Sequence, residues 1–514
     1  MKPDAPRRSL LRRHRDFRLL WCGETAGKFG ASVTGVAMPL IAVSELHAST
    51  FQIGLLSAAS WAPWLVVGLA AGVWVDRLPR RTVMLVSAAV SLVLFTAVPA
   101  AAWAGRLSTG LLLAVALLTG TSAVFFQTAY TAYLPDLLAP ADQPEGNAKL
   151  HGSASAAQIA GLGSGGLVAQ LAGAANGMLA NAATFLVSLL CLSGIRHRET
   201  PAAARDGRVR NHDGHDPGRA GRGPEHTGRG TDRALRREIG EGLRLVAGDR
   251  WLRTLTLYGA TSNLALMGYQ SILVAFLVRE VGLAPGTVGG LVAVAGSGGV
   301  LGAFAARRVA SRVGTARAML LFELGLPVLA LLIPLTGSGT GVLCYAVGGF
   351  GVSAGVVAGN VIKAGFQQHY CPPELLGRIT ASAAVLNFGT IPVGALLAGV
   401  LGTAVGLRPA MWITTAGVPL AGLVLLLSPV GRARDLPTTH HPPPGRSGRR
   451  AGARARHRRG HRLTGPHRSS SARSVRDPRR PVRARRARGR TGASRRLGPW
   501  HSARTASGSR RRPG

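Results

Sequence analysis

Cysteine is scarce in this chain: four of its 514 residues are cysteines, at Cys22, Cys191, Cys344 and Cys371. Their spacing matches neither a zinc site nor a disulfide framework. The sequence also lacks a glycine-rich phosphate-binding loop, a cluster of metal-ligating side chains and a nucleophile with a nearby base. These absences argue against an ATP-driven pump and against a membrane enzyme. We therefore expect no catalytic residues, no metal and no cofactor.

Acidic residues are also few, with 22 Asp and Glu against 61 Lys and Arg, and the formal net charge is +39. Residues 431–514 hold 26 Arg, no Lys and two Asp, so this tail carries +24 of that charge. Its composition, rich in Pro, Ser and Gly, cannot bury a core and predicts disorder. Such a tail attracts anionic lipid or RNA without specificity, so no specific nucleic-acid partner is expected. A displaced reading frame, which would leave the tail free of selection, is the alternative explanation.

Apolar residues, in contrast, make up 47% of the chain and occur in blocks. Runs of about 20 apolar residues can each cross a hydrocarbon core of about 30 Å as a helix. Backbone groups in lipid have to satisfy one another, which requires helices. The sequence predicts an all-α membrane protein with twelve transmembrane helices. They are expected at residues 17–44, 51–75, 82–104, 109–134, 147–172, 175–195, 253–279, 285–306, 315–336, 340–364, 380–404 and 409–429.

A polar break separates the first six predicted helices from the last six. The predicted domains are a basic cytoplasmic N-terminus (1–16), a six-helix bundle (17–195), a cytoplasmic linker with an interfacial helix (196–250), a second six-helix bundle (251–430) and the Arg-rich tail (431–514). Most Lys and Arg outside the tail fall on alternate links, and positive residues stay in the cytoplasm. We therefore predict that both termini lie on the cytoplasmic side of a bacterial plasma membrane.

The two halves share an internal repeat. Gly68, Gly72, Asp76 and Arg77 match Gly298, Gly302, Ala306 and Arg307 at an offset of 230 residues. The sequence Pro-Asp-Leu-Leu at 135–138 matches Pro-Glu-Leu-Leu at 373–376 at an offset of 238. Two matches at nearly one offset predict two parallel six-helix repeats, an arrangement that places a substrate path between the halves.

One short stretch, Gly72-x-x-x-Asp76-Arg77-x-x-Arg80-Arg81, resembles the motif that links helices 2 and 3 in the major facilitator superfamily. Residues 17–24, 373–382 and 389–394 are similar to its bacterial exporter branch, which contains enterobactin-type siderophore and macrolide efflux proteins. The resemblance covers residues 15–430. It implies a secondary transporter that works by alternating access and exports a small amphipathic compound against a proton gradient.

The sequence differs from the family's motifs at two places, and both differences argue against a proton-antiport mechanism taken directly from the relatives. Leu162 replaces the proline of the antiporter helix-5 pattern, and residues 109–133 carry no charge where many proton-coupled relatives have an arginine. The alternatives are a solute importer or facilitator, and a non-transporting membrane sensor or scaffold whose basic tail binds a partner. We expect a small-molecule substrate, contact with the lipid bilayer and a monomer.

The resemblance also implies a gate. Asp76 would pair with Arg77, Arg80 and Arg81 and cap a helix of the second half, which would hold the cytoplasmic side closed. A carboxylate at a helix N-terminus contributes about 0.3–1 kcal/mol, enough to bias such an equilibrium. In the alternative, the arginines are topology signals alone. The corresponding second-repeat gate consists of Gly302, Arg307, Gly377 and Arg378.

Ionisable and polar residues inside the predicted helices are the candidate proton and substrate sites, because they are costly in lipid. Glu24 and Lys28 share a helix face and form either a structural pair or a proton or substrate site. Glu323 is close to a helix end and is interpreted as structural. The polar candidates, which are equally able to bond helices together, are Gln127, Tyr130, Tyr258, Asn263, Tyr269, Gln270, Asn360 and Asn387.

Glycine is frequent, with 69 residues. Pairs of small residues four positions apart allow helices to approach closely and to slide. The glycines expected to pack helices in this way are Gly68, Gly161, Gly165, Gly166 and Gly298, together with Gly72 and Gly302 of the repeat.

Overall fold

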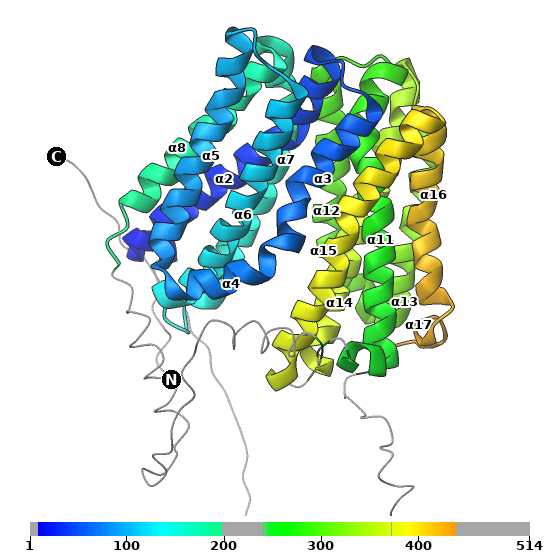
Figure 1. Cartoon of the computed structure of the whole chain (residues 1–514). Helices are drawn as coiled ribbons and strands as arrows, with labels where there is room; N and C mark the ends of the chain where they lie inside the picture. The colour runs from blue at the N-terminus through cyan, green and yellow to red at the C-terminus, as the bar shows by residue number, and fades with distance from the viewer. Residues whose placement is uncertain (1–8, 198–239, 241, 243, 372, 438–514) are drawn as a thin grey trace, which may run out of the picture. The chain divides into compact units, whose positions relative to one another are not determined.

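A computed structural model describes residues 9–197, 240, 242, 244–371 and 373–437. Within these ranges the chain forms helices joined by short links, and no strand occurs in them (Figure 1). Half of the basic N-terminus, and most of the predicted linker with its interfacial helix and of the Arg-rich tail, lies outside the described residues.

The first half begins with a short helix and continues as long antiparallel ones. Its elements are α1 (Leu10–Arg13), α2 (Arg15–Leu40), the π-helical turn η1 (Ile41–Glu45), α3 (Thr50–Val66), α4 (Gly68–Arg77), α5 (Arg80–Trp103), α6 (Thr109–Leu137), α7 (Gln143–Ala172) and α8 (Ala174–Ser193).

The second half has the same order of long helices. Its elements are α11 (Arg250–Ala275), the π-helical turn η2 (Phe276–Glu280), α12 (Pro285–Val313), α13 (Thr315–Leu320), the π-helical turn η3 (Leu321–Gly325), the 3₁₀ helices η4 (Leu326–Leu335) and η5 (Gly339–Gly341), α14 (Val342–Tyr370), α15 (Pro373–Ala404), α16 (Leu407–Leu426) and α17 (Pro429–Arg432).

Ten helical segments of the described chain are long and apolar enough to cross a membrane. Each of the ten corresponds to one predicted helix, and the span at the predicted ninth helix, 315–336, is built from α13, η3 and η4. The predicted second and fifth helices are not among the ten. The second is interrupted, and the fifth, α7, is rich in glycine, serine and glutamine. The count of twelve crossings and the orientation stay predictions.

The second predicted helix, 51–75, is wrong as a continuous helix. It ends as α3 at Val66, and α4 starts at Gly68. Pro63 lies in the last turn of α3, where its ring removes a backbone donor. Glycine at the start of α4 has no Cβ to stiffen the chain. These two residues account for the interruption at Val67.

Three helices extend past their apolar runs. Helix α12 continues to Val313 and α14 to Tyr370, and α15 begins at Pro373. Their added turns are rich in polar and charged residues, so hydrophobicity alone predicted these helices too short. The arginines predicted for the link after the eighth helix therefore lie on α12 itself.

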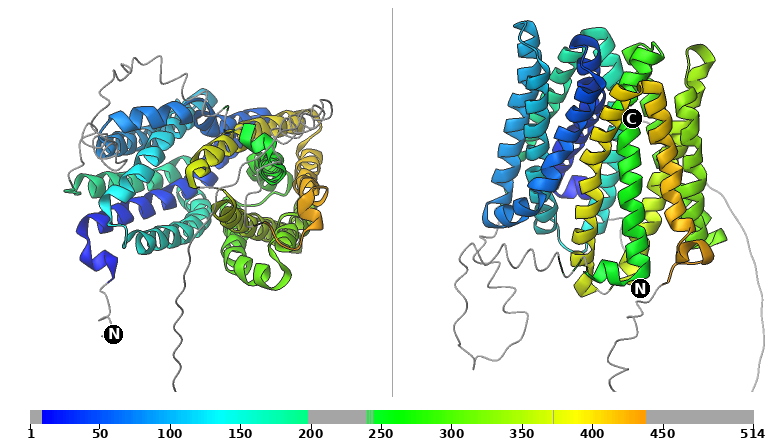
Figure 2. Two further views of the ribbon diagram at one scale, coloured as in Figure 1. Left: turned by 90° about the horizontal axis from the view of Figure 1, so that it is seen from below. Right: turned by 45° about the vertical axis from the view of Figure 1, so that its right-hand side comes forward.

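The two halves contact each other through α3 with α15 and α7 with α12 (Figure 2). Glycines make these contacts close: a Cβ on Gly54 would lie 2.8 Å from the Cα of Gly399, and one on Gly166 would lie 2.6 Å from the Cα of Gly289. All four residues lie near the helix ends farthest from α1 and α17. We call the side with α1 and α17 the terminal side and the other the opposite side. The halves are thus joined near the opposite side.

Packing of the second half continues past its predicted end at residue 430. Asp435 accepts a hydrogen bond from the Thr315 backbone N–H at the start of α13 (2.9 Å), and Leu436 N–H donates to the Thr315 hydroxyl (2.8 Å). Val430 and Leu436 are buried. The segment up to Leu436 is therefore part of the folded second half.

Candidate functional site

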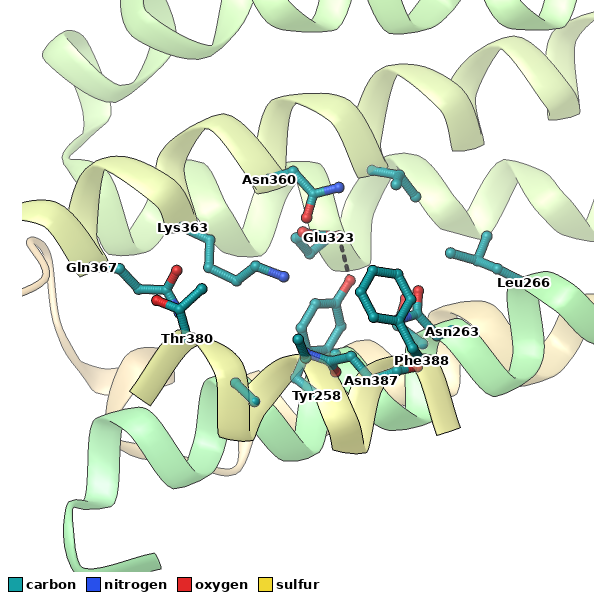
Figure 3. Close-up of a pocket in the computed structure, with 15 residues that line it drawn as sticks. Tyr258, Asn263, Leu266, Glu323, Asn360, Lys363, Gln367, Thr380, Asn387 and Phe388 are labelled. Carbon is teal, nitrogen blue, oxygen red and sulfur yellow. Dashed lines mark hydrogen bonds between the residues drawn. The ribbon is translucent and has the colours of Figure 1, made fainter. Parts of the chain in front are cut away.

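A cavity of about 400 Å³ lies in the second half, between α11, η3, α14 and α15 (Figure 3). Polar groups and apolar walls are mixed in its lining. The polar lining residues are Tyr258, Ser262, Asn263, Glu323, Asn360, Lys363, Gln367, Thr380 and Asn387, and the larger apolar ones are Leu266, Val356 and Phe388.

The acid of this cavity, Glu323, sits at an irregular point of its helix. Pro327 has no N–H, so the Glu323 carbonyl four residues earlier has no helical donor there. The chain responds with the π-helical turn η3 followed by the 3₁₀ helix η4. Such π-helical turns are frequent at functional sites.

The Glu323 side chain is 3% exposed and is held by two neighbouring helices. Tyr258 of α11 donates a hydrogen bond to its Oε2. On α14, Gly359 lies directly against its Oε1, and any Cβ at that position would overlap the carboxyl group. A side chain at 359 would force the carboxyl group of Glu323 to move, because that group occupies the space of a Cβ.

Lys363 lies one turn after Gly359 on α14 and directs its ammonium into the cavity toward Glu323 and Tyr258 (Figure 3). Lys363 and Glu323 do not form an ion pair: none of the ion pairs between described residues, defined by a nitrogen–oxygen distance of at most 4.0 Å, joins them. The acid and the base therefore face one cavity without being bonded to each other.

Amide groups supply further hydrogen-bonding capacity. The Asn263 side chain donates to the backbone carbonyl of Asn387 (3.2 Å). The side-chain oxygen Oδ1 of Asn387 is buried and has no hydrogen-bond partner among the described atoms. An acceptor of this kind is available to an N–H or O–H group of a ligand.

Aromatic rings connect the cavity to the first half. The ring of Phe388 stacks on Trp61 of α3, with centroids 6.5 Å apart, and lies 5.6 Å from Trp64. A Cβ on Gly389 would lie 3.4 Å from Cδ1 of Leu65, the residue after Trp64. The wall formed by Phe388 thus depends on the position of α3, next to the interruption at Val67.

Four predicted site residues lie together in the first half. Lys28 Nζ is 3.2 Å from Glu24 Oε1 and donates to Gln127 Oε1 (3.4 Å). Glu24 is buried, and Tyr130 stacks on Phe126 one turn away on α6. The geometry is that of a closed ion pair, which favours the structural interpretation of Glu24 and Lys28.

The remaining polar candidates are divided between the cavity and its surroundings. Asn263, Asn360 and Asn387 line the cavity, as does Tyr258. Tyr269 is buried in the apolar core and does not line the cavity, and Gln270 is exposed. Sequence reasoning named Glu323 but interpreted it as structural, and it did not single out Lys363 as a site residue. An ionisable residue within a span was the available signal for both.

In the predicted gate, the described arginine contacts are with helix ends of the first half. Arg80 binds Asp136 (2.7 Å) and the carbonyl of Ala132 (2.6 Å) on α6. Arg81 donates to the carbonyls of Leu192 (3.1 Å) and Ser193 (2.7 Å) at the end of α8. A cation at a helix C-terminus is favourable.

The rest of the gate is less defined. The side chains of Asp76 and Arg378 lie outside the described residues, and Arg77, Arg307 and Gly377 are exposed. The gate therefore stays a prediction.

The repeat glycines differ between the halves. Gly298 and Gly302 lie against the backbone of α14 at Phe350 and Ala354. A Cβ at Gly68 or Gly72 would meet no described atom within 4 Å. The motif is thus packed in the second half and open in the first.

Two other predicted packing glycines join α7 to α2. A Cβ on Gly161 would lie 2.5 Å from the carbonyl oxygen of Phe29, and one on Gly165 would lie 3.0 Å from that of Val33. Gly166 faces α12 instead. Within the described chain, no group of three His, Cys, Asp or Glu could hold a metal ion.

Comparison with known proteins identifies relatives over most of the chain. The family model of the Major Facilitator Superfamily matches residues 20–388. The multidrug efflux pump Tap of Mycobacterium tuberculosis is 30% identical over 416 residues, which cover 79% of this chain and 92% of the pump. Tap of Mycolicibacterium fortuitum is 28% identical over 430 residues, covering 81% and 96%.

Among solved structures, a bacterial homologue of the iron transporter ferroportin in an inward-facing state has a TM-score of 0.61 at 15% identity. The match covers 82% of this chain and 99% of that one. At this identity the likeness concerns the fold.

Proposed function

This chain belongs to the major facilitator superfamily, and from that premise we propose that it exports small amphipathic compounds, drugs among them, in exchange for protons. The family consists of membrane transporters and not of enzymes, and the chain is a multi-pass protein of the bacterial inner membrane. The observation that carries the proposal is its similarity to multidrug efflux pumps over 79% of its length.

The cavity of the second half supports an amphipathic substrate. Leu266, Val356 and Phe388 offer apolar surface, while Asn263 and Asn387 offer hydrogen bonds. Pockets of this kind, with a few polar groups among apolar walls, orient small organic ligands. The volume of about 400 Å³ suits a drug-sized compound or part of a larger one.

The contacts between the halves support alternating access. They are closest near the opposite side, at Gly54 with Gly399 and Gly166 with Gly289. Across the same side, Arg279 donates to the Val43 carbonyl (3.3 Å). With the predicted orientation, the outer side is closed in this conformation. Export then requires these glycine contacts to separate while the terminal side closes.

A susceptibility panel tests the function. The full chain is expressed in a bacterial host that lacks its own efflux pumps, and growth is measured across drugs, macrolides and siderophores. We expect resistance to at least one amphipathic compound, lower accumulation of that compound in the cell, and loss of both when a protonophore collapses the proton gradient.

Other outcomes would contradict the proposal. Export that survives collapse of the gradient would reject proton coupling. Higher accumulation would indicate an importer, and no effect on any compound would favour a non-transporting sensor or scaffold. Asp76→Asn in the same host tests the predicted gate, since it removes the charge and keeps the size.

A further inference from the structure

We propose that Glu323 is the carboxyl group that binds and releases the driving proton, and that Lys363 is the counter-ion that replaces this proton when it leaves. This inference deepens the proposed function, on which its transport step rests. It assigns the role to the second half instead of to Glu24.

The surroundings of Glu323 allow two stable states. Placing a carboxylate in a low-dielectric interior is costly unless an opposite charge compensates it. Glu323 is buried, receives a hydrogen bond from Tyr258 and faces a cavity that Lys363 also lines. The carboxyl group is therefore stable with its own proton, or ionised with the Lys363 ammonium brought into contact.

The charged and titratable side chains of the helices packed on η3 are consistent with these two states of Glu323. Helix α11 presents Tyr258 and α14 presents Lys363. On α13, Arg317 is exposed. Helix α16 carries one ionisable residue, Arg408, which bonds the carbonyls of Pro334 and Thr336 on the opposite side. Lys363 is thus the cation of the described chain that can reach Glu323.

The proposed step balances in protons and charge. The Glu323 O–H bond breaks, the proton passes to water in the cavity, and the carboxylate attracts the Lys363 ammonium, which keeps its own protons. Closing the gap brings the Lys363 side chain against the carboxylate and adds a bond between α14 and η3, which already touch at Gly359. Binding of a new proton reverses the step and returns the Lys363 ammonium to the cavity.

Glu24 provides the matched comparison. Its counter-ion, Lys28, is four residues away on one helix and already within 3.2 Å. Loss of a proton from Glu24 would therefore change few contacts between helices. Glu323 and Lys363 belong to different helices, so the charge state of Glu323 changes how η3 and α14 pack.

The first experiment follows the proton itself and needs no substrate. The purified full chain is reconstituted in liposomes, and infrared difference spectra are recorded between acidic and alkaline pH to detect the C=O band of a protonated carboxyl group. We expect Glu323→Gln to remove one titrating band and Glu24→Gln to keep it. A spectrum that Glu323→Gln leaves unaltered would overturn the assignment.

The second experiment follows transport, using the compound most strongly exported in the susceptibility panel. The protein is reconstituted in liposomes, where molecules with their cytoplasmic side facing outward transport the compound into the lumen. We expect Glu323→Gln to lower this gradient-driven uptake at least tenfold while gradient-independent exchange of the compound continues. Glu24→Gln should stay dependent on the gradient, whatever its rate. If Glu323→Gln also abolishes exchange, Glu323→Asp must restore both activities, and failure of this rescue would reject the proposal.

The two experiments separate the inference from the proposed function. Gradient-driven transport that persists in Glu323→Gln refutes the inference and leaves the function intact. A wild-type chain that exports no compound refutes the function, and the infrared band alone then decides whether Glu323 binds the proton.

Discussion

Replacing Gly359 with alanine tests whether the Glu323 carboxyl group is held where the structure places it. The new Cβ would overlap that carboxyl group, which must then move away from Tyr258. Loss of the hydrogen bond costs about 1–3 kcal/mol. Overpacking costs a further ~1–3 kcal/mol. Alanine returns about 1 kcal/mol of helix propensity. The net expectation is a destabilisation of about 1–5 kcal/mol.

The matched control is Gly365→Ala on the same helix. A Cβ there would meet no described atom within 4 Å, so the substitution should be neutral or stabilise by up to about 1 kcal/mol. The assay is the midpoint of thermal aggregation of the purified protein in detergent, and Gly359→Ala should aggregate at a lower temperature than Gly365→Ala. A Gly359→Ala protein as stable as Gly365→Ala would refute the placement of the carboxyl group.

Three further predictions use other contacts. Gly166→Leu should lower export at least tenfold because it separates α7 from α12, whereas Gly152→Leu on α7, with no described atom within 4 Å of a Cβ, should export normally in the same accumulation assay. Arg81→Ala should lower the thermal midpoint by the equivalent of about 1–3 kcal/mol, since two bonds to the end of α8 are lost; an unchanged midpoint would contradict this. A chain ending at Pro429 should be at least about 3 kcal/mol less stable than one ending at Pro437, because it loses the cap of α13 and two buried side chains; equal midpoints would show that this segment does not contribute.

The helical fold and its repeat could be predicted because they depend on local sequence. Apolar runs fix which segments enter the bilayer, and the polar break divides them into halves. The end of α12, the end of α14 and the start of α15 could not be placed this way, since those turns are rich in polar and charged residues. The interruption at Val67 was missed because the apolar run continues through it, past Pro63 and Gly68.

The candidate site was predicted in part. Asn263, Asn360 and Asn387 were identified because polar groups stand out within apolar helices, and they do line the cavity. Glu323 was interpreted as structural from its distance to a helix end. That distance says nothing about which neighbours a side chain faces within the π-helical turn η3, which contains Glu323 and departs from regular α-helical spacing.

The sequence by itself determined that this chain crosses a membrane, that its halves repeat and which family it resembles, because hydrophobicity and short motifs are properties of the chain alone. The tertiary structure decided which charges meet. Glu24 and Lys28 are close on one helix in any fold, so their pairing followed from spacing. The meeting of Glu323, Tyr258 and Lys363 depends on how three helices are rotated against one another, and Gly359 provides the space for it.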